Sequence, residues 1–289
     1  MAFIGGGNMA SAIIGGLIAQ GVTPAQILVV EPWEEARANL KKNFGIDALP
    51  EAGEALAKAQ LVVWAVKPQT FKEAAAVAAQ FTRSAVHLSI AAGITSDSIA
   101  AWLATDRIVR AMPNTPALVG KGITGLFARA AVTTDEKLLI ERVISTTGQF
   151  VWVKTENDLD AVTALSGSGP AYVFLFLEAM TKAGEDMGLP AAQAYQLAVA
   201  TFQGASELAA RSDESADVLR QRVTSKGGTT HAAITHMQAT HIPEHFADAL
   251  KAGEPTRRLA TLPAWRDPPF FRDRQRTRRT GLDEGRHAG

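Results

Sequence analysis

Hydrophobic and polar positions divide the chain into two halves of different periodicity. In the first half, short apolar runs alternate with helical patterns, and these runs cover residues 1–4, 27–30, 61–66, 85–90, 107–112, 123–128 and 149–154. Most of the runs are apolar at every position, which is typical of strands buried on both faces of a parallel sheet. The pattern predicts an α/β fold with a doubly wound, mostly parallel sheet.

From residue 156 onward no strand pattern recurs, and Ala, Leu, Gln and Glu dominate. This half is predicted to be all-helical, with helices after residue 168 and over residues 190–210, 215–223 and 231–237. The first of them is apolar as far as Glu178. A helix that is apolar all round is a buried one, and so much apolar surface in a small helical half indicates burial against a second subunit. We therefore expect a dimerisation domain over residues 156–252, after a first domain over residues 1–155.

Composition removes several classes of function. Lys and Arg number 29 and Asp and Glu number 29, so the chain as a whole has no field that would attract nucleic acid or an acidic membrane. Without Cys, a disulfide, a thiolate nucleophile and a cysteine metal site are excluded. No apolar run approaches the length of a membrane span. We expect a cytoplasmic protein. Residues 253–289 are rich in Arg and Pro without periodicity, and this tail is predicted to be disordered.

A glycine turn follows the first apolar run. Gly5, Gly7 and Ala10 have the G-x-G-x-x-G/A spacing, in which the glycines permit a tight turn and a close approach of backbone to a pyrophosphate. Glu31 closes the next apolar run, where an acid commonly bonds the adenosine ribose and favours NAD. Arg37 lies near enough to favour NADP instead, so the spacing leaves the choice open. The first domain is predicted to bind a dinucleotide.

Three further candidates follow later strands, because open α/β sheets bind ligands beyond the carboxyl ends of their strands. Lys67 precedes Pro68, which can begin a helix, and would lie near cofactor ribose or phosphate. Ala91 belongs to the small residues 89–93, which would let a planar ring come close. Asn114 offers a carboxamide to a nicotinamide or a ribose hydroxyl. A solvated lysine, a compact turn and a self-capping Asn114 remain open as alternatives.

The helical half contains a second glycine turn over residues 224–230, which leads into a predicted helix. Successive N–H groups in a Gly-Gly turn before a helix form an anion site, suited to a substrate carboxylate. A plain helix–helix corner with a capping Thr is the alternative. Ser168 is expected to cap the apolar helix, with Pro170 in its first turn. Because Ser occupies position 166, the G-x-S-x-G elbow of serine hydrolases is absent.

The histidines do not indicate a metal site. His231, His236, His241 and His245 are spaced by five, five and four residues, and Pro243 interrupts the one helical pair. His87 lies inside an apolar strand and is expected to be a packed core residue. We expect no metal.

With both turns placed, the chain closely resembles pyrroline-5-carboxylate reductase. The motifs are IGGGNMA, AVKPQ, SIAAG, RAMPNTPA, LSGSGPAY and VTSKGGTT, in this order within residues 1–250. The resemblance implies a dinucleotide domain, a helical domain that interlaces with its partner in a homodimer or a higher oligomer, and NADPH as donor with NADH tolerated. It also implies reduction of pyrroline-5-carboxylate to proline, which needs positioning more than side-chain chemistry.

Carried over by position, the resemblance implies that the first turn holds the pyrophosphate and the second the substrate carboxylate. Thr230 is the catalytic candidate, with its hydroxyl toward the pyrroline nitrogen. The cofactor-binding residues that we expect are Gly5, Gly7, Asn8, Met9, Ala10, Glu31, Ala65, Val66, Lys67, Pro68, Ala91 and Asn114. The expected substrate-binding residues are Ser225, Gly227, Gly228, Thr229 and Thr230.

Two other functions remain as alternatives. One is another imine or 3-hydroxyacid reductase of the same two-domain shape, although such hydroxyacid enzymes place a lysine in the central helix at the level of the substrate. Lys182 lies near the far end of that helix. The other is a nucleotide-binding protein without turnover, because the amino terminus is short and the resemblance ends near residue 250.

Overall fold

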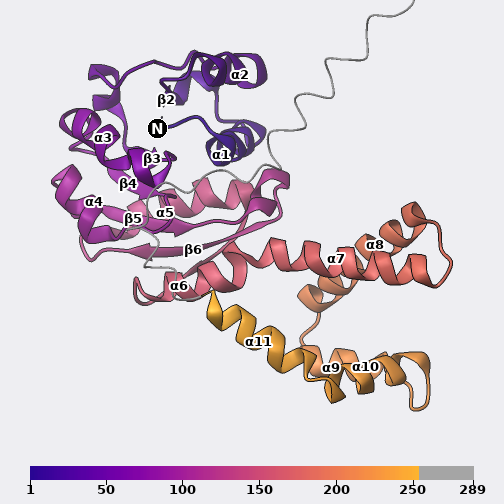
Figure 1. The fold of residues 1–289 in the computed structure, drawn as a ribbon. Helices are drawn as coiled ribbons and strands as arrows, with labels where there is room; N and C mark the ends of the chain where they lie inside the picture. Colours follow the sequence, from indigo (N-terminus) through magenta and orange to yellow (C-terminus); the bar gives the residue numbers. More distant parts are fainter. Residues whose placement is uncertain (254–289) are drawn as a thin grey trace, which may run out of the picture.

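A computed structural model describes residues 1–253 of the chain. Their first half forms a 7-stranded sheet in the order β2-β1-β3-β4-β5-β6-β7 (Figure 1). The strands are Ala2–Ile4 (β1), Leu28–Val30 (β2), Leu61–Trp64 (β3), Val86–Ser89 (β4), Ile108–Met112 (β5), Gly122–Ala128 (β6) and Gly148–Trp152 (β7). Neighbouring strands run parallel, except β6, which is antiparallel to β5. The predicted doubly wound, mostly parallel sheet is confirmed.

Five helices cover the two faces of this sheet. They are Asn8–Ala19 (α1), Glu34–Phe44 (α2), Pro68–Ala78 (α3), Ser96–Leu103 (α4) and Thr134–Ile144 (α5). Short 3₁₀ turns over Pro24–Gln26, Glu54–Lys58, Ala79–Phe81, Thr115–Val119 and Ser145–Thr147 connect or extend them. The helices α3 and α4 lie on one side of the sheet and α1 on the other (Figure 1).

The strands are apolar at every position because both faces of the sheet are buried, as their pattern indicated. Alternate residues of β3 point to opposite faces, so that Val63 enters the core beneath α1 and α5 while Trp64 enters the core beneath α3 and α4. Both side chains are fully buried. Each strand therefore needs apolar residues at odd and even positions alike, since neither face meets water.

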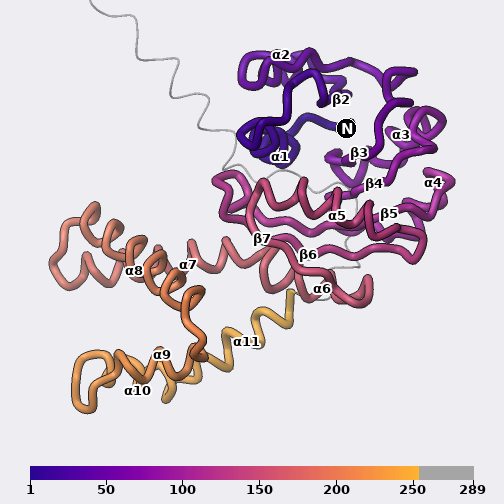
Figure 2. Tube along the Cα trace, turned by 180° about the vertical axis from the view of Figure 1, so that it is seen from behind, coloured from indigo at the N-terminus to yellow at the C-terminus, as the bar shows by residue number. Residues whose placement is uncertain are grey.

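The second half is helical and extends away from the sheet (Figures 1 and 2). It consists of Asp158–Val162 (α6), a π-helical turn over Thr163–Gly167, Gly169–Asp186 (α7), Ala191–Arg211 (α8), Ala216–Arg222 (α9), Thr229–Ala239 (α10) and Ile242–Ala252 (α11). Within the described residues, no helix is both long and apolar enough to cross a membrane. The tail that we predicted to be disordered lies, after Gly253, outside the described residues.

Two local expectations in this half are wrong. Ser168 occupies the N-cap position of α7, but its side chain makes no capping hydrogen bond, because its backbone is itself helical and its N–H donates to the Thr163 carbonyl through the π turn. The helix α11 was not predicted, since Pro243 was taken as an interruption. Pro243 instead occupies the first turn of α11, after His241 in a left-handed conformation, and proline is well tolerated there.

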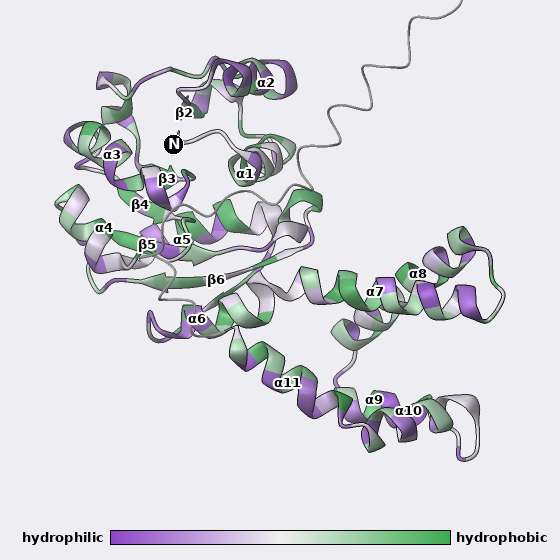
Figure 3. Cartoon of the chain, viewed as in Figure 1, coloured by the Kyte–Doolittle hydropathy of each residue, from purple (hydrophilic) through white to green (hydrophobic). Residues whose placement is uncertain are grey.

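The helical half buries little of its apolar surface within one chain. From residue 156 to residue 253, the buried apolar residues are Leu159, Ala164, Leu177, Ala194 and Ala198. On α7, Phe174 is 58% exposed and Leu175 is 62% exposed. Apolar residues follow α7 and α8 in Figure 3. A surface of this kind is typical of an interface that a partner covers.

Candidate functional site

The turn between β1 and α1 requires glycine at one position and is open at another. Gly5 has a φ of +96°, and a Cβ there would lie 2.6 Å from the Ala65 carbonyl oxygen. A Cβ at Gly7 would meet nothing within 4 Å. No side chain caps α1, whose first turn contains Asn8 and Met9. The uncapped N–H groups of this helix therefore face an open surface that an anion can approach.

Glu31 braces this turn from the neighbouring strand. It is 8% exposed, and its Oε2 accepts a hydrogen bond from the Gly6 N–H at 2.7 Å. Its Oε1 accepts from the Trp33 N–H at 3.0 Å. Both carboxylate oxygens thus hold backbone amides, one in each of the turns that follow β1 and β2. The structure gives Glu31 a local function that its position in the sequence did not predict.

Arg37 lies in the first turn of α2, and its guanidinium reaches back to the carboxyl end of β2. Its Nη1 donates to the carbonyl oxygens of Glu31, at 3.0 Å, and Pro32, at 2.6 Å. These bonds leave the Nε and Nη2 donors without a hydrogen bond to the residues that the structure describes. Trp33, which is 75% exposed, belongs to the same turn. A cation and an aromatic ring therefore flank the strand end where doubly wound folds hold the adenosine.

The other predicted cofactor residues follow β3 and β4. Ala65 donates its N–H to the Ile4 carbonyl at 2.8 Å and so extends the sheet toward the first glycine turn. Lys67 is exposed at the N-cap of α3, and Pro68 occupies its first turn, as the sequence predicted. Ala91 is buried in the loop after β4. These positions border the same carboxyl edge of the sheet as the first glycine turn.

Asn114 follows β5 and contacts the helical half. Its Nδ2 donates to the Ser166 carbonyl in the π turn at 3.2 Å, and its Oδ1 accepts from the Ile123 N–H at 3.0 Å. The side chain does not cap its own turn, which was the alternative from sequence. The carboxamide thus joins the end of the sheet to the helix that leads into the second domain.

The second glycine turn connects α9 to α10 and is exposed. Gly227 has a φ of +76°, and Gly228 forms the N-cap of α10 without any capping side chain. The Gly228 N–H donates to the Ser225 carbonyl at 3.0 Å, which closes the turn. The side chains of Thr229 and Thr230 are exposed in the first turn of α10. The predicted anion site therefore has free helix N–H groups and two hydroxyls beside them.

The two glycine turns lie far apart within one chain. The β1–α1 turn belongs to the body around the sheet, whereas the α9–α10 turn belongs to the arm that projects from it (Figures 1 and 2). A site that contains both turns cannot be assembled from a single chain in this arrangement.

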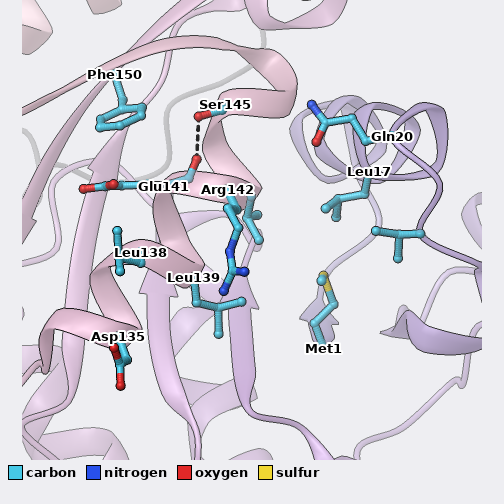
Figure 4. Close-up of a pocket in the computed structure, with 12 residues that line it drawn as sticks. Met1, Leu17, Gln20, Asp135, Leu138, Leu139, Glu141, Arg142, Ser145 and Phe150 are labelled. Carbon is cyan, nitrogen blue, oxygen red and sulfur yellow. Dashed lines mark hydrogen bonds between the residues drawn. The ribbon is translucent and has the colours of Figure 1, made fainter.

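Two cavities differ in their relation to these residues. One, of about 780 Å³, lies between α1 and α5, and Figure 4 shows Leu17, Arg142 and Phe150 in its wall. None of the predicted site residues lines it. The other, of about 530 Å³, is lined by Asn114 and by the apolar side chains of α7 and α11, among them Phe174 and Phe246. Only the second is close to a candidate residue.

Comparisons with known proteins agree with this two-domain arrangement. Residues 1–93 match a family of NADP oxidoreductases described as coenzyme F420-dependent, and residues 156–258 match the pyrroline-5-carboxylate reductase dimerisation domain. A pyrroline-5-carboxylate reductase of Pseudomonas aeruginosa is 45% identical over 254 residues, which cover 87% of this chain and 93% of that one. The chain belongs to the pyrroline-5-carboxylate reductase family.

Solved structures of the family have the same fold. The pyrroline-5-carboxylate reductase of Coxiella burnetii superposes with a TM-score of 0.85 at 38% identity and covers 91% of this chain and 98% of its own. That of Plasmodium falciparum, solved with NADP bound, has a TM-score of 0.77 at 27% identity, with 89% and 95% covered. The resemblance expected from the motifs is confirmed over nearly the whole length of these relatives.

One contact at the junction of the domains was not predicted. The Glu156 carboxylate accepts from the backbone N–H and the hydroxyl of Ser96, each at 2.6 Å, and from Arg110 Nη1 at 2.6 Å. Burial opposes the ionisation of Glu156, but the bonds from Ser96 and Arg110 outweigh it and lower the pKa of the carboxyl group. The partners are distant in sequence, so no local pattern could have indicated them.

His87 and Lys182, two further residues considered from the sequence, lie outside the two turns. His87 is a core residue, as expected, and its Nδ1 accepts from Trp64 Nε1 at 3.0 Å. Lys182 is exposed and pairs with Asp186 on the same helix. Across residues 1–253, no group of three or more His, Cys, Asp or Glu side chains could hold a metal ion.

Proposed function

We propose that this protein reduces 1-pyrroline-5-carboxylate to L-proline by hydride transfer from NADPH, with NADH as an alternative donor. This reaction is the final step of proline biosynthesis, and the proposed location is the cytoplasm. The observation that carries the proposal is the pair of uncapped helix N-termini, one after each glycine turn, in a chain that is 45% identical to a named reductase. Two anion sites are what a dinucleotide and an amino-acid carboxylate require.

The first turn fits the cofactor. Gly5 tolerates no side chain and Gly7 leaves open space above the uncapped α1, so a pyrophosphate can reach the N–H groups of Asn8, Met9 and Ala10. We propose that the loops after β3 and β4 line the ribose and the nicotinamide through Ala65, Val66, Lys67, Pro68 and Ala91. The bound nicotinamide supplies the hydride.

The second turn is proposed to hold the substrate. Backbone N–H groups over residues 225–230 would bind its carboxylate, with Ser225, Gly227, Gly228 and Thr229 forming the turn. The Thr230 hydroxyl would orient the ring nitrogen or relay its proton. A cyclic imine that is protonated on nitrogen is already electrophilic, so the protein has to hold the ring at the right distance rather than to activate it. This account uses no side chain as a strong general base.

Arg37 and Trp33 are proposed to recognise the 2′-phosphoadenosine half of NADPH. Arg37 is anchored at the end of β2 with Nε and Nη2 left to donate, and a guanidinium binds phosphate well. Trp33 offers its ring for stacking with adenine. Glu31, which holds Gly6 and Trp33 by its two oxygens, would support the turn rather than repel the phosphate.

We further propose a homodimer in which each site takes one glycine turn from each copy. The exposed apolar residues of α7 and α8 provide the surface for this association, and the matched domain family is named for dimerisation. The separation of the two turns in one chain supports a site between copies. Light scattering distinguishes a dimer from a higher oligomer.

The test is a turnover assay on the purified protein with NADPH and pyrroline-5-carboxylate. The proposal expects NADPH oxidation matched by the formation of proline, with a lower KM for NADPH than for NADH. Turnover with another imine or a 3-hydroxyacid but not with pyrroline-5-carboxylate would assign the protein to a different reductase. Binding of NADPH without any turnover would make it a non-catalytic relative.

A further inference from the structure

The chain passes from the sheet into the second domain through one nearly continuous helix, residues 158–186, which we call the rod. It consists of α6 and α7 with the π turn Thr163–Gly167 between them. A π turn widens the helix by one residue, so some carbonyl groups there lose their usual partner and must find another. Such turns occur frequently at functional sites.

Two side chains donate hydrogen bonds to carbonyl oxygens of this turn. Tyr172, one turn further along the rod, donates its hydroxyl to the Ala164 carbonyl at 3.2 Å. Asn114, from the loop after β5, donates to the Ser166 carbonyl at 3.2 Å and is held in turn by the Ile123 N–H at 3.0 Å. Asn114 is almost fully buried. The π turn is therefore fixed from the sheet on one side and from its own helix on the other.

The same turn lies against the end of β5 and is connected to α11. A Cβ on Gly167 would lie 2.7 Å from Cε, the terminal atom of the flexible Met112 side chain, so the π turn packs closely against the end of β5. The Tyr172 ring meets Phe246 of α11 edge-on, with centroids 6.0 Å apart. The helix α11 follows α10, which begins at the second glycine turn. A continuous set of contacts thus runs from Asn114 to α11, the helix that comes after the one beginning at the proposed substrate turn.

We propose that Asn114 and Tyr172 are positioning residues that hold the π turn and thereby set how the helical arm is oriented on the cofactor domain. Both hydrogen bonds that orient the Asn114 amide are made to protein backbone, so its main effect is on the placement of the arm and not on the affinity for NADPH. The inference rests on the proposed reductase function. Hydride transfer is sensitive to displacements of about 1 Å, which can cost roughly a hundredfold in rate.

The test separates cofactor binding from turnover in two variants. Asn114→Asp keeps the size of the side chain and the acceptor for Ile123 but places an oxygen against the Ser166 carbonyl. Tyr172→Phe removes one hydroxyl. We expect both to bind NADPH within about twofold of the wild-type Kd, measured by fluorescence titration without substrate, while kcat falls about tenfold or more in Asn114→Asp and less in Tyr172→Phe.

Asn43→Asp, which adds the same charge at an exposed position of α2, is the matched control and should behave as wild type. A tenfold weaker Kd for NADPH in Asn114→Asp, with kcat retained at saturating cofactor, would make Asn114 a cofactor ligand and overturn the inference. An unchanged kcat in both variants would overturn it as well. Should Asn114→Asp not fold, Tyr172→Phe decides alone. Failure of the proposed function itself is distinct, since the wild-type protein would then not reduce pyrroline-5-carboxylate.

Discussion

The two halves of the molecule differ in how completely one chain accounts for them. The sheet has a core on each face, and its glycine turn is fixed by the Val30 carbonyl, by the Glu31 carboxylate and by close packing against Ala65. The helical arm has few buried apolar residues, and its exposed glycine turn is closed by one backbone hydrogen bond, from Gly228 to Ser225.

The difference teaches that the two proposed anion sites have different origins. The proposed cofactor site is formed by the fold of a single chain, because every element that shapes its turn lies within the first half. The proposed substrate site is formed by a single chain only in part, since its turn stands on an arm whose apolar side is uncovered. Assembly would supply both the missing burial and the missing neighbour.

The largest expected effect is on the association of two copies through the helical arm. Leu175→Asp places a charge in the exposed apolar surface of α7, where the account expects a second copy. Dimer affinity should fall by at least about a hundredfold, because each copy loses the burial of a leucine and gains a charge to bury. Activity should be lost while NADPH binding is retained, as measured by light scattering and fluorescence titration.

Leu138→Asp is the matched control for that variant. Leu138 is 49% exposed on α5 in the first half, against 62% for Leu175. The control should remain a dimer with full activity. If Leu175→Asp is also a fully active dimer, the uncovered face of α7 is not the interface.

The second effect concerns the proposed substrate turn alone. Thr230→Ala removes the hydroxyl that we propose lies beside the ring nitrogen, so kcat should fall about tenfold or more with little change in the Kd for NADPH. Thr230→Ser, which keeps the hydroxyl, should retain most of the activity. Steady-state kinetics of the two variants provide the measurement, and full activity in Thr230→Ala would remove the role assigned to Thr230.

The third effect is on the discrimination between NADPH and NADH by the first half of the chain. Arg37→Met removes the guanidinium but keeps much of its stem, so the KM for NADPH should rise about tenfold while that for NADH stays unchanged. Lys42→Met is the control: it removes one positive charge from the last turn of the same helix, away from the end of β2, and should change neither the KM for NADPH nor that for NADH. Equal losses for both cofactors in Arg37→Met would argue against recognition of the 2′-phosphate.

The last effect is on the stability of the first half at low pH and not on binding or activity. Burial lowers the pKa of His87 to about 4, against an ordinary value of 6.5. The folded protein therefore takes up this proton later than the unfolded chain, and stability falls as the pH drops from about 6.5 toward 4, by up to about 3 kcal/mol. His87→Gln should flatten this part of the pH profile in urea denaturation. An unchanged slope would mean that other groups cause the loss.

Periodicity was sufficient to predict the sheet. Runs that are apolar at every position mark strands buried on both faces, and the seven predicted runs correspond to the seven strands. The glycine spacing located the first turn for a similar reason, because the φ of +96° at Gly5 is a demand of the local backbone, to which the close packing against Ala65 is added. Both signals are local, so the sequence carries them directly.

What the sequence did not predict depends on partners that are distant along the chain. The bond from Gly6 to Glu31 spans 25 residues, and that from Asn114 to Ser166 spans 52. The π turn has no periodic signature, and Ser168 was misjudged as a cap because the helix before it was not recognised as continuous. Pro243 was misjudged because a proline stops one helix and begins another with equal ease.

The most direct test of the central claim, that each site is shared between two copies, is complementation between two inactive variants. Gly7→Asp adds a carboxylate to the first turn, where a side chain has room, and Thr229→Asp adds one to the second. If sites are shared, an equimolar mixture after subunit exchange should regain about a quarter of wild-type activity, since half the dimers are mixed and each has one intact site. A mixture no more active than its parents, with mixed dimers shown to be present, would contradict the account.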